Sequence, residues 1–200
     1  TPSRTRVYNG DRLVDYQTDH TGTIIEGDRL VVQFPADAGL TDVGFKPNAY
    51  ASYYVERISD GKIVTDNYTF GEPVIGTLTV TPVKIELTAA SDSKTYDGTP
   101  LTNGNYTITK GSFATYTKRV DGVNIEVVEG LESVTVEGSQ TTVGSSANTI
   151  TGHTLKANTL AKNYDITYQP GTLEVTQNTE TIIITANSNT WDYDGQPHTD

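Results

Sequence analysis

The chain contains no cysteine and no methionine among its 200 residues. Without cysteine, neither a disulfide framework nor thiol chemistry is available. Without methionine there is no initiator residue, so we expect a processed or excised piece of a longer polypeptide. No apolar run approaches the roughly 18 residues that span a bilayer, and no signal-peptide pattern opens the sequence. These absences predict a protein that does not insert into a membrane.

Basic residues are also scarce, because 14 Lys and Arg stand against 25 Asp and Glu, for a formal charge of -11. An anionic surface repels phosphates, which argues against nucleic acid as a partner. Solubility is the simplest explanation of the charge. Hydrophobic residues reach only 34%, and the Thr, Tyr and Val content favours pleated, half-buried strands. This composition fits an exported protein of a Gram-positive-type bacterium, although a cytosolic protein can also lack cysteine.

A short motif occurs three times, and internal similarity of this kind indicates repeated domains. Each copy places a tyrosine before Asp-Gly or Asn-Gly. The motif residues are Tyr8, Asn9 and Gly10; Tyr96, Asp97 and Gly98; and Tyr193, Asp194 and Gly195. The unit between copies is roughly 90 to 97 residues long, a typical domain size.

The flanks of the motif agree as well. Residues 84–91, before the second copy, match residues 181–188, before the third. Later landmarks match between the first two copies: Glu-Gly at 26 and 129, Val-Gly at 43 and 143, Asn-Tyr at 67 and 163, and Gly-Thr-Leu-x-Val-Thr at 76 and 171. The predicted domains are 1–82, a degenerate first repeat without its opening strand; 83–177, a complete repeat; and 178–200, the start of a third repeat.

Nearly every ordered stretch has the pattern of a strand. Residues 124–128, 164–168 and 172–176 alternate in polarity, and Asn-Gly, Asp-Gly and Pro-Gly pairs mark turns. Gln169-Pro170-Gly171 predicts a hairpin turn that joins 164–168 to 172–176 and closes the repeat. We therefore predict an all-β fold of tandem, immunoglobulin-like β-sandwich repeats. The alternative is a β-grasp-like mixed sheet, which needs a short helix or a crossover.

The Tyr-Asp-Gly motif is open to two interpretations. An aromatic ring beside a carboxylate is a common pairing in sugar-binding sites. Asp or Asn before Gly is equally the chemistry of a turn, because both tolerate positive φ and accept a local backbone hydrogen bond. The tyrosine would then anchor the turn to the core, with its hydroxyl satisfied nearby. We favour this structural interpretation.

Catalytic and metal-binding patterns find little support. His20, His153 and His198 occupy unrelated points of the repeat, so neither a Ser-His-Asp triad nor a zinc site is predicted. No Asp-x-Asp-x-Asp calcium loop with a trailing Glu occurs. We predict no enzymatic activity, no metal and no cofactor, with calcium left as an open alternative.

A Lys–Asn isopeptide crosslink between strands is a further alternative. Such a crosslink would join Lys84 or Lys94 to Asn148 or Asn163 in the second repeat. Neither lysine is kept in the third copy, whereas a crosslink that depends on the shared fold should recur. The sequence therefore does not favour it.

Taken together, Tyr-Asp-Gly, Val-Gly, Asn-Tyr and Gly-Thr-Leu-x-Val-Thr resemble the YDG/MBG-type repeats, which occur in tandem in secreted and cell-wall-anchored proteins of Firmicutes and related bacteria. The resemblance covers nearly all of 83–177 and, as far as they go, 178–200. The first repeat departs from it, because Asn9 replaces the aspartate and no proline follows. The resemblance implies a stalk or adhesin segment, with no catalytic residues to carry over.

Two functions follow as hypotheses. The first is a non-catalytic stalk or spacer in an extracellular, cell-wall protein, whose partners are the neighbouring repeats. The second is an adhesive module that binds a host glycan or protein directly. Because residues 181–200 form an opening strand and turn with no domain of their own, we also expect strand exchange with the first repeat of another copy.

Overall fold

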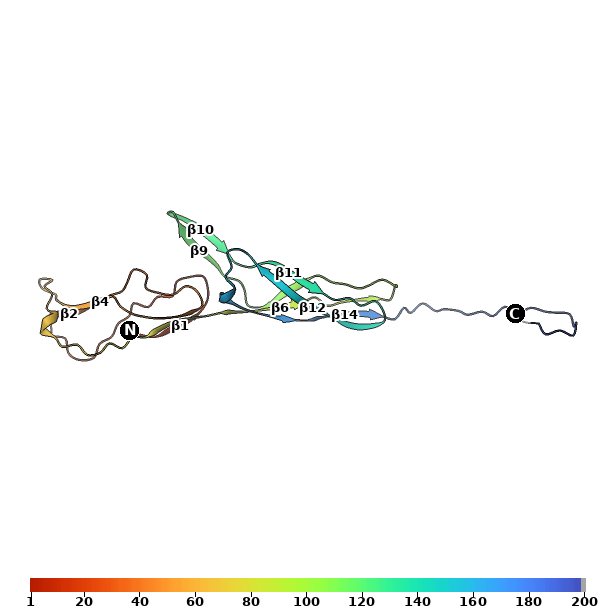
Figure 1. The fold of residues 1–200 in the computed structure, drawn as a ribbon, viewed down its shortest axis with the longest axis horizontal. Helices are drawn as coiled ribbons and strands as arrows, with labels where there is room; N and C mark the ends of the chain where they lie inside the picture. Colours follow the sequence, from red (N-terminus) through yellow and green to blue (C-terminus); the bar gives the residue numbers. More distant parts are fainter. Residues whose placement is uncertain (199–200) are drawn as a thin grey trace.

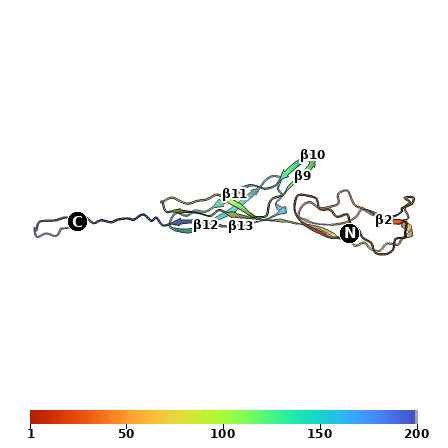
Figure 2. The same ribbon diagram turned by 180° about the vertical axis from the view of Figure 1, so that it is seen from behind.

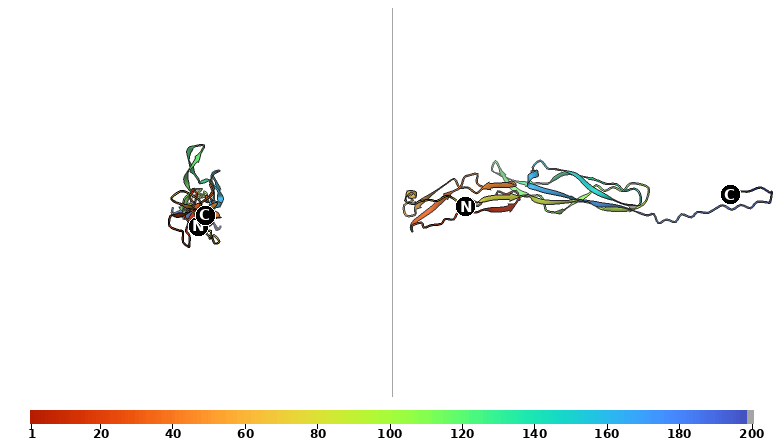
Figure 3. Two further views of the ribbon diagram at one scale, coloured as in Figure 1. Left: turned by 90° about the vertical axis from the view of Figure 1, so that its left-hand side faces the viewer. Right: turned by 60° about the horizontal axis from the view of Figure 1, so that its bottom comes forward.

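The computed structural model of the chain describes residues 1–198, so the last two residues of the expected third repeat lie outside it. Three parts lie one after another along the long axis, as Figure 1 shows: residues 1–82 (unit 1), 83–177 (unit 2) and 178–198 (the tail). The same order is seen from behind in Figure 2, and the end-on view in Figure 3 is narrow. The chain is thus an elongated rod whose tail projects from unit 2 on the side away from unit 1.

Unit 2 is built from two facing sheets and a hairpin. Its strands are β6 (Val83–Ala89), β7 (Asp92–Thr95), β8 (Tyr106–Lys110), β9 (Thr115–Val120), β10 (Val123–Val128), β11 (Leu131–Glu137), β12 (Gly144–Leu155), β13 (Tyr164–Gln169) and β14 (Gly171–Thr176). In one sheet β6 is central, parallel to β13 and antiparallel to β8. The other sheet has the order β11-β12-β14-β7, and β7 runs parallel to β14. Because β12 contacts β6 and β13, the sheets enclose a core between them.

Alternation along β6 and β14 fills this core. In β6, Ile85 and Leu87 are buried while Lys84 is exposed, and in β14, Leu173 and Val175 are buried. Successive side chains of a strand point to opposite faces, so a period of two in the sequence becomes one apolar face. Each fully buried Leu or Ile side chain contributes about 1.5–3 kcal/mol relative to exposure.

Unit 1 has fewer strands. They are β1 (Arg4–Val7), β2 (Asp28–Gln33), β3 (Gly44–Pro47), β4 (Ser52–Arg57) and β5 (Thr77–Thr81). β5 lies between β1, which is parallel to it, and β3, which is antiparallel, while β2 and β4 form a separate antiparallel pair. Only Pro82 separates β5 from β6, so the last strand of unit 1 leads directly into unit 2.

Residues matched by the repeat make the same contacts in both units. The backbone amide of the motif tyrosine donates to a carbonyl of the last strand at 2.8 Å in each case: Tyr8 to Thr81, and Tyr96 to Thr176. An isolated antiparallel bridge follows each motif, Leu13 with Leu40 and Leu101 with Gln140. The sequence similarity therefore reflects shared backbone geometry.

The two units differ in two places. The hairpin β9–β10 occurs only in unit 2, where it projects beside the junction (Figure 1). In unit 1 the segments 17–24 and 68–74, which correspond to β8 and β13, contain no strand, and no described residues stand in the place of β6. Among the described residues, unit 1 thus contains no counterpart of the three-stranded sheet β13-β6-β8 of unit 2.

The predicted hairpin of residues 164–176 is wrong. β13 and β14 follow each other in sequence but lie in different sheets, β13 beside β6 and β14 between β12 and β7. The chain crosses between the sheets at Pro170, and a Cβ on Gly171 would lie 2.4 Å from the carbonyl oxygen of Ala90. Turn residues mark a change of path, and here the path leads to another layer instead of back along the same strand.

The prediction of an all-β fold is confirmed. The helical segments of residues 1–198 are only the short 3-10 turns η1 (Thr65–Asn67) and η2 (Ala161–Asn163). The short helix of the β-grasp alternative does not occur in this part of the chain. No helix within it is long and apolar enough to cross a membrane.

The crossing at Gly171 should tolerate no side chain. We expect Gly171→Ala to lower the free energy of unfolding by about 1–3 kcal/mol, because the added methyl meets backbone carbonyls that cannot move aside. Gly152→Ala is the matched control, since a Cβ there has nothing within 4 Å; it should change stability by less than about 0.5 kcal/mol. Urea unfolding of both variants measures the difference, and equal effects would contradict the steric explanation.

Candidate functional site

A buried carboxylate lies at the junction of the two units. Glu129, between β10 and β11, is 4% exposed. Its Oε1 accepts a hydrogen bond from the Tyr8 hydroxyl of unit 1 at 2.8 Å, and its Oε2 accepts one from the Tyr164 hydroxyl. The Tyr116 hydroxyl lies 3.5 Å from the same carboxylate. Three tyrosines from both units therefore satisfy a group that would be costly to bury alone.

The local sequence places these groups. Tyr8 follows β1, and its ring meets the Tyr164 ring edge-on, with centroids 5.7 Å apart. Tyr164 begins β13, and its hydroxyl oxygen also accepts the Ala114 amide at 2.9 Å. The hairpin brings Tyr116 over Gly10, where an added Cβ would lie 2.0 Å from the Tyr116 ring. The turn of unit 1 is thus held between the body and the hairpin of unit 2.

The environment keeps these tyrosines protonated. Burial, followed by the hydrogen bond to Glu129, raises the pKa of Tyr8 well above its ordinary value near 10. Burial and the bond to Glu129 likewise raise the pKa of Tyr164, and burial with the nearby Glu129 charge raises the pKa of Tyr116. A protonated phenol is the form that can donate to the carboxylate, so the arrangement favours hydrogen bonding over proton transfer.

Polar contacts outside the cluster also join the units. The Asn163 side-chain oxygen accepts the Val43 amide at 2.9 Å, and its nitrogen donates to Asp42 at 3.0 Å. Lys162 pairs with Asp42 at 3.2 Å. Asn163 is fully buried, so removing either bond would leave a buried polar atom unpaired.

One hydrophobic cluster runs through both units. It contains Leu78 and Val80 of β5 together with Ile85 and Leu87 of β6, all at most 1% exposed. Tyr8 belongs to the same cluster. The junction is therefore continuous core, unlike the polar and wet interface expected between freely moving domains.

All three Tyr-Asp-Gly motifs form the same turn. The side-chain oxygen of Asn9, Asp97 or Asp194 accepts the backbone amide two residues on: Asp11 at 3.1 Å, Thr99 at 2.9 Å and Gln196 at 2.9 Å. The following glycines Gly10, Gly98 and Gly195 have φ of 84°, 82° and 76°. These bonds account for the Asp-Gly and Asn-Gly pairs as turn chemistry. In the second copy the Lys94 ammonium and Thr99 also hold the pKa of Asp97 well below its usual range.

The three motif tyrosines have different surroundings. Tyr8 is 4% exposed, Tyr96 is 42% exposed and Tyr193 is 99% exposed. Tyr8 packs into the core cluster that contains residues of both units, as expected of a tyrosine that anchors the turn to the core, whereas Tyr193 is packed against no core. Sequence reasoning did not identify Glu129 as a site residue, although its Glu-Gly landmark recurs in the repeat.

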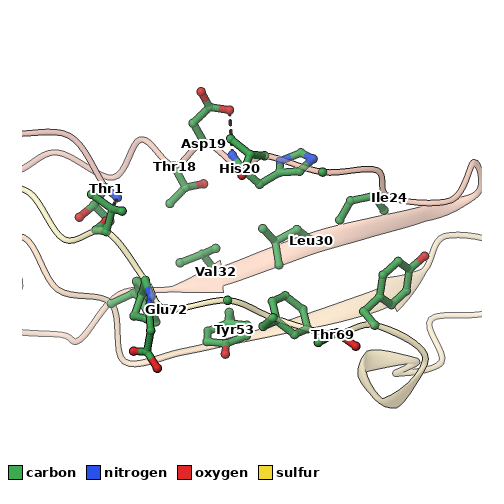
Figure 4. Close-up of a pocket in the computed structure, with 18 of the residues that line it drawn as sticks. Thr1, Thr18, Asp19, His20, Ile24, Leu30, Val32, Tyr53, Thr69 and Glu72 are labelled. Atoms are coloured by element: carbon green, nitrogen blue, oxygen red, sulfur yellow. Dashed lines mark hydrogen bonds between the residues drawn. The ribbon is translucent and has the colours of Figure 1, made fainter.

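Unit 1 contains a groove of about 980 Å³. Its two walls are the segments 17–24 and 68–74. Leu30 and Val32 of β2 lie between them, and Tyr53 of β4 lies beside segment 68–74 (Figure 4). Tyr53 and Phe70 pack ring to ring with centroids 4.7 Å apart. The groove thus combines aliphatic and aromatic side chains with polar and charged ones, among them Asp19, His20 and Glu72.

Groups for other chemistry are not brought together. Among residues 1–198 no cluster of three His, Asp or Glu side chains could hold a metal ion. The Lys94 ammonium bonds Asp97 and Thr99, while the Asn148 amide nitrogen donates to the carbonyls of Ala90 and Asn103. The amide that an isopeptide bond would use is therefore engaged with backbone.

Comparison with known proteins returned no match: no family model, no curated protein and no solved structure resembles this chain significantly.

The bond from Tyr8 to Glu129 should stabilise the junction. We expect Tyr8→Phe to lower the free energy of unfolding by about 1–3 kcal/mol, because it leaves a buried acceptor with one donor fewer. Tyr193→Phe, on a side chain that is 99% exposed, is the control and should have no measurable effect. Denaturant unfolding followed by fluorescence tests the pair, and an unchanged midpoint for Tyr8→Phe would contradict the assigned bond.

Stability should also fall in alkaline solution. The pKa of Tyr8 and of Tyr164 is raised in the folded chain, so their contribution is fully present below about pH 10, the ordinary pKa of tyrosine. Above it the unfolded phenols ionise first, and each group lowers stability by about 1.4 kcal/mol per pH unit until the folded pKa is passed. Thermal unfolding between pH 8 and 11 should show this slope, and Tyr8→Phe should reduce it.

Proposed function

We propose that the chain is a non-catalytic, structural stalk or spacer of a bacterial cell-surface protein. The observation that carries the proposal is the junction: unit 1 and unit 2 share one core, with Glu129 buried between Tyr8 and Tyr164. A spacer must hold its distal end at a fixed distance, and a continuous core resists bending better than a flexible linker. The one-residue connection at Pro82 supports the same conclusion.

The strand order of unit 2 should also let it resist a pulling force on its two ends. A pull on the two ends of the unit draws β6 toward unit 1 and β14 toward the tail. The force then acts along the parallel ladders β6–β13 and β7–β14, which have six and four registered pairs. Bonds loaded side by side break together, whereas bonds loaded from one end of a ladder open one at a time.

We assign the unit to the immunoglobulin-like β-sandwiches as the finer fold class. Two facing sheets and a core between them favour this assignment, although the parallel pairs β6–β13 and β7–β14 depart from fully antiparallel sheets. The recurring motifs favour kinship with YDG/MBG-type repeats, and the acidic, cysteine-free composition favours an extracellular cell-wall location.

Force spectroscopy can test the spacer directly. Because the chain has no cysteine, handles introduced by Pro82→Cys and Gln177→Cys pull unit 2 in shear. Handles introduced by Pro82→Cys and Ala161→Cys pull on neighbouring ends of β6 and β13, which open pair by pair. We expect severalfold higher unfolding force in the first geometry.

Equal forces in the two geometries would contradict a role in resisting tension. A glycan array and a panel of matrix proteins distinguish the alternative adhesive module, since a spacer gives no specific signal on either. Saturable binding that is lost when the groove residue Tyr53 is changed to Ala would favour the adhesive function instead.

A further inference from the structure

The hairpin of unit 2 projects from the junction as a ribbon of its own. Its strands β9 and β10 form a two-stranded sheet, paired from Val120 with Val123 at the tip to Thr115 with Val128 at the base. The ribbon stands out from the rod in Figure 1 and in the end-on view of Figure 3. Each strand therefore has one edge with no neighbouring strand among residues 1–198, and such an edge is a template for pairing with another chain.

A hydrogen bond at the base of the hairpin shows which backbone groups point outward. The Glu129 amide continues the ladder beyond β10 and donates to the Ala114 carbonyl, just before β9, at 3.0 Å. Along an antiparallel pair, residues alternate between bonding to the partner strand and facing away from it. Odd-numbered residues of β10 therefore bond to β9. The even-numbered Asn124 and Glu126 turn their backbone amide and carbonyl groups to the outer edge.

Val128 agrees with this assignment and marks the end of the free edge. It is an even-numbered residue, and its carbonyl accepts the Asn158 side-chain amide, from outside the hairpin, at 3.1 Å. The outer edge of β10 is thus occupied at Val128. Its open part consists of Asn124 and Glu126 with the residues around them.

The two faces of the hairpin differ in polarity. Directly paired residues lie on the same face, and one face carries Val120, Val123 and Ile125. Val123 and Ile125 are 62% and 46% exposed. The other face carries the polar residues Asn124 and Glu126. A strand added to this edge must keep the separation, with apolar residues opposite apolar ones.

Strand β10 meets this requirement when it pairs with β10 of a second copy. In an antiparallel pair centred on Ile125, the two Ile125 side chains lie opposite each other, and each Val123 lies opposite Val127 of the other copy. These residues all belong to the apolar face. Asn124 then lies opposite Glu126, so the outward backbone groups of both residues exchange hydrogen bonds. The Asn124 amide is also a donor that suits the Glu126 carboxylate.

Other registers lose one of these matches. A shift of the pairing by one residue places the apolar face of one copy beside the polar face of the other. Centring the pair on Glu126 places two carboxylates opposite each other, which is destabilising. Centring it on Asn124 moves Glu126 opposite the turn residue Gly122, so fewer strand residues pair. The register centred on Ile125 is therefore favoured.

The opposite edge of the hairpin, along β9, is less suited to pairing. It carries the adjacent cations Lys118 and Arg119, and such charges protect an edge strand from association. Tyr116 of the same strand is packed over Gly10 of unit 1. Strand β10, in contrast, contains no cation and no proline.

We propose that two copies of this chain associate side by side through β10, as an antiparallel pair with its two-fold axis at Ile125. The two hairpins then form one sheet in the order β9-β10-β10-β9. The same edge serves both copies, so the contact closes at a dimer. Antiparallel pairing places the base of each hairpin beside the tip of the other, and the two rods lie at opposite ends of the shared sheet. This role goes beyond that of a spacer, because it joins neighbouring spacers sideways.

Analytical ultracentrifugation of the 200-residue chain, up to millimolar concentration, tests the dimer. The unchanged chain should pass from monomer to dimer as the concentration rises. Glu126→Pro should weaken dimerisation at least tenfold, because proline removes an outward amide of β10 and no bond to β9. Thr117→Pro is the matched control. Thr117 lies directly opposite Glu126 and its amide points to the outer edge of β9, so dimerisation should persist.

Three results would overturn the proposal. A chain that stays monomeric at all concentrations does so, and it leaves a strand of another protein as the occupant of the edge. Equal loss in the two proline variants does so, because a general disturbance of the hairpin then explains the effect. Association that survives Glu126→Pro does so as well, because it runs through another surface, such as the apolar tail.

Single cysteines test the register, because the chain has none of its own. Ile125→Cys places two cysteines opposite each other on the two-fold axis, about 4.5 Å apart between Cα atoms, within the range of a disulfide. Asn124→Cys is the control, since its two copies lie about 8.6 Å apart, beyond that range. Mild oxidation should trap at least tenfold more dimer with Ile125→Cys. Equal trapping, or preferential trapping of Asn124→Cys, contradicts the proposed pairing.

Discussion

A central strand of a sheet needs hydrogen-bonding partners along both of its edges. This constraint on β6, the first strand of unit 2, determines how the two units are joined. β6 meets it with β8 and β13. Because Pro82 alone separates β5 from β6, the strand that closes unit 1 leads directly into the middle strand of a sheet in unit 2. The path of the chain thus passes from core to core with no linker between, which fixes the direction of one unit relative to the next.

The buried carboxylate adds specificity to that direction. Glu129 receives hydroxyl groups from Tyr8 in unit 1 and from Tyr164 in unit 2, so it is fully satisfied only in one mutual orientation. A rotated junction would leave a buried charge or a buried phenol unpaired, at a cost of several kcal/mol. Hydrophobic contact among Leu78, Val80 and Ile85 is less directional. The apolar cluster therefore favours contact, and the tyrosine–carboxylate cluster selects its geometry.

Sequence pattern predicted the strands well and their partners poorly. Alternation in β6 and β14 is visible because one face of each is buried, and the Asp-Gly and Asn-Gly turns are local chemistry. The turn residues around Pro170 could not show whether a hairpin forms there. β14 either returns beside β13 or crosses to β12 and β7, and the choice depends on strands that are distant in the sequence. Glu129 is a landmark of the repeat, but Tyr8, its hydrogen-bond donor from unit 1, lies 121 positions away in the sequence. Only the fold brings Tyr8 to it.

The tail shows that a strand-like sequence pattern does not by itself form a strand. Residues 181–186 share the polarity of β6, yet they contain no strand, whereas β6 has two neighbours and is fully ordered in a sheet. Backbone amides and carbonyls of an extended segment gain little over solvation until a partner edge is present. Residues 177–179 also replace the single Pro82, so the second joint is longer and contains no proline to stiffen it. The first joint is therefore stiffened by the chain itself, whereas the three residues of the second joint leave it freer to bend.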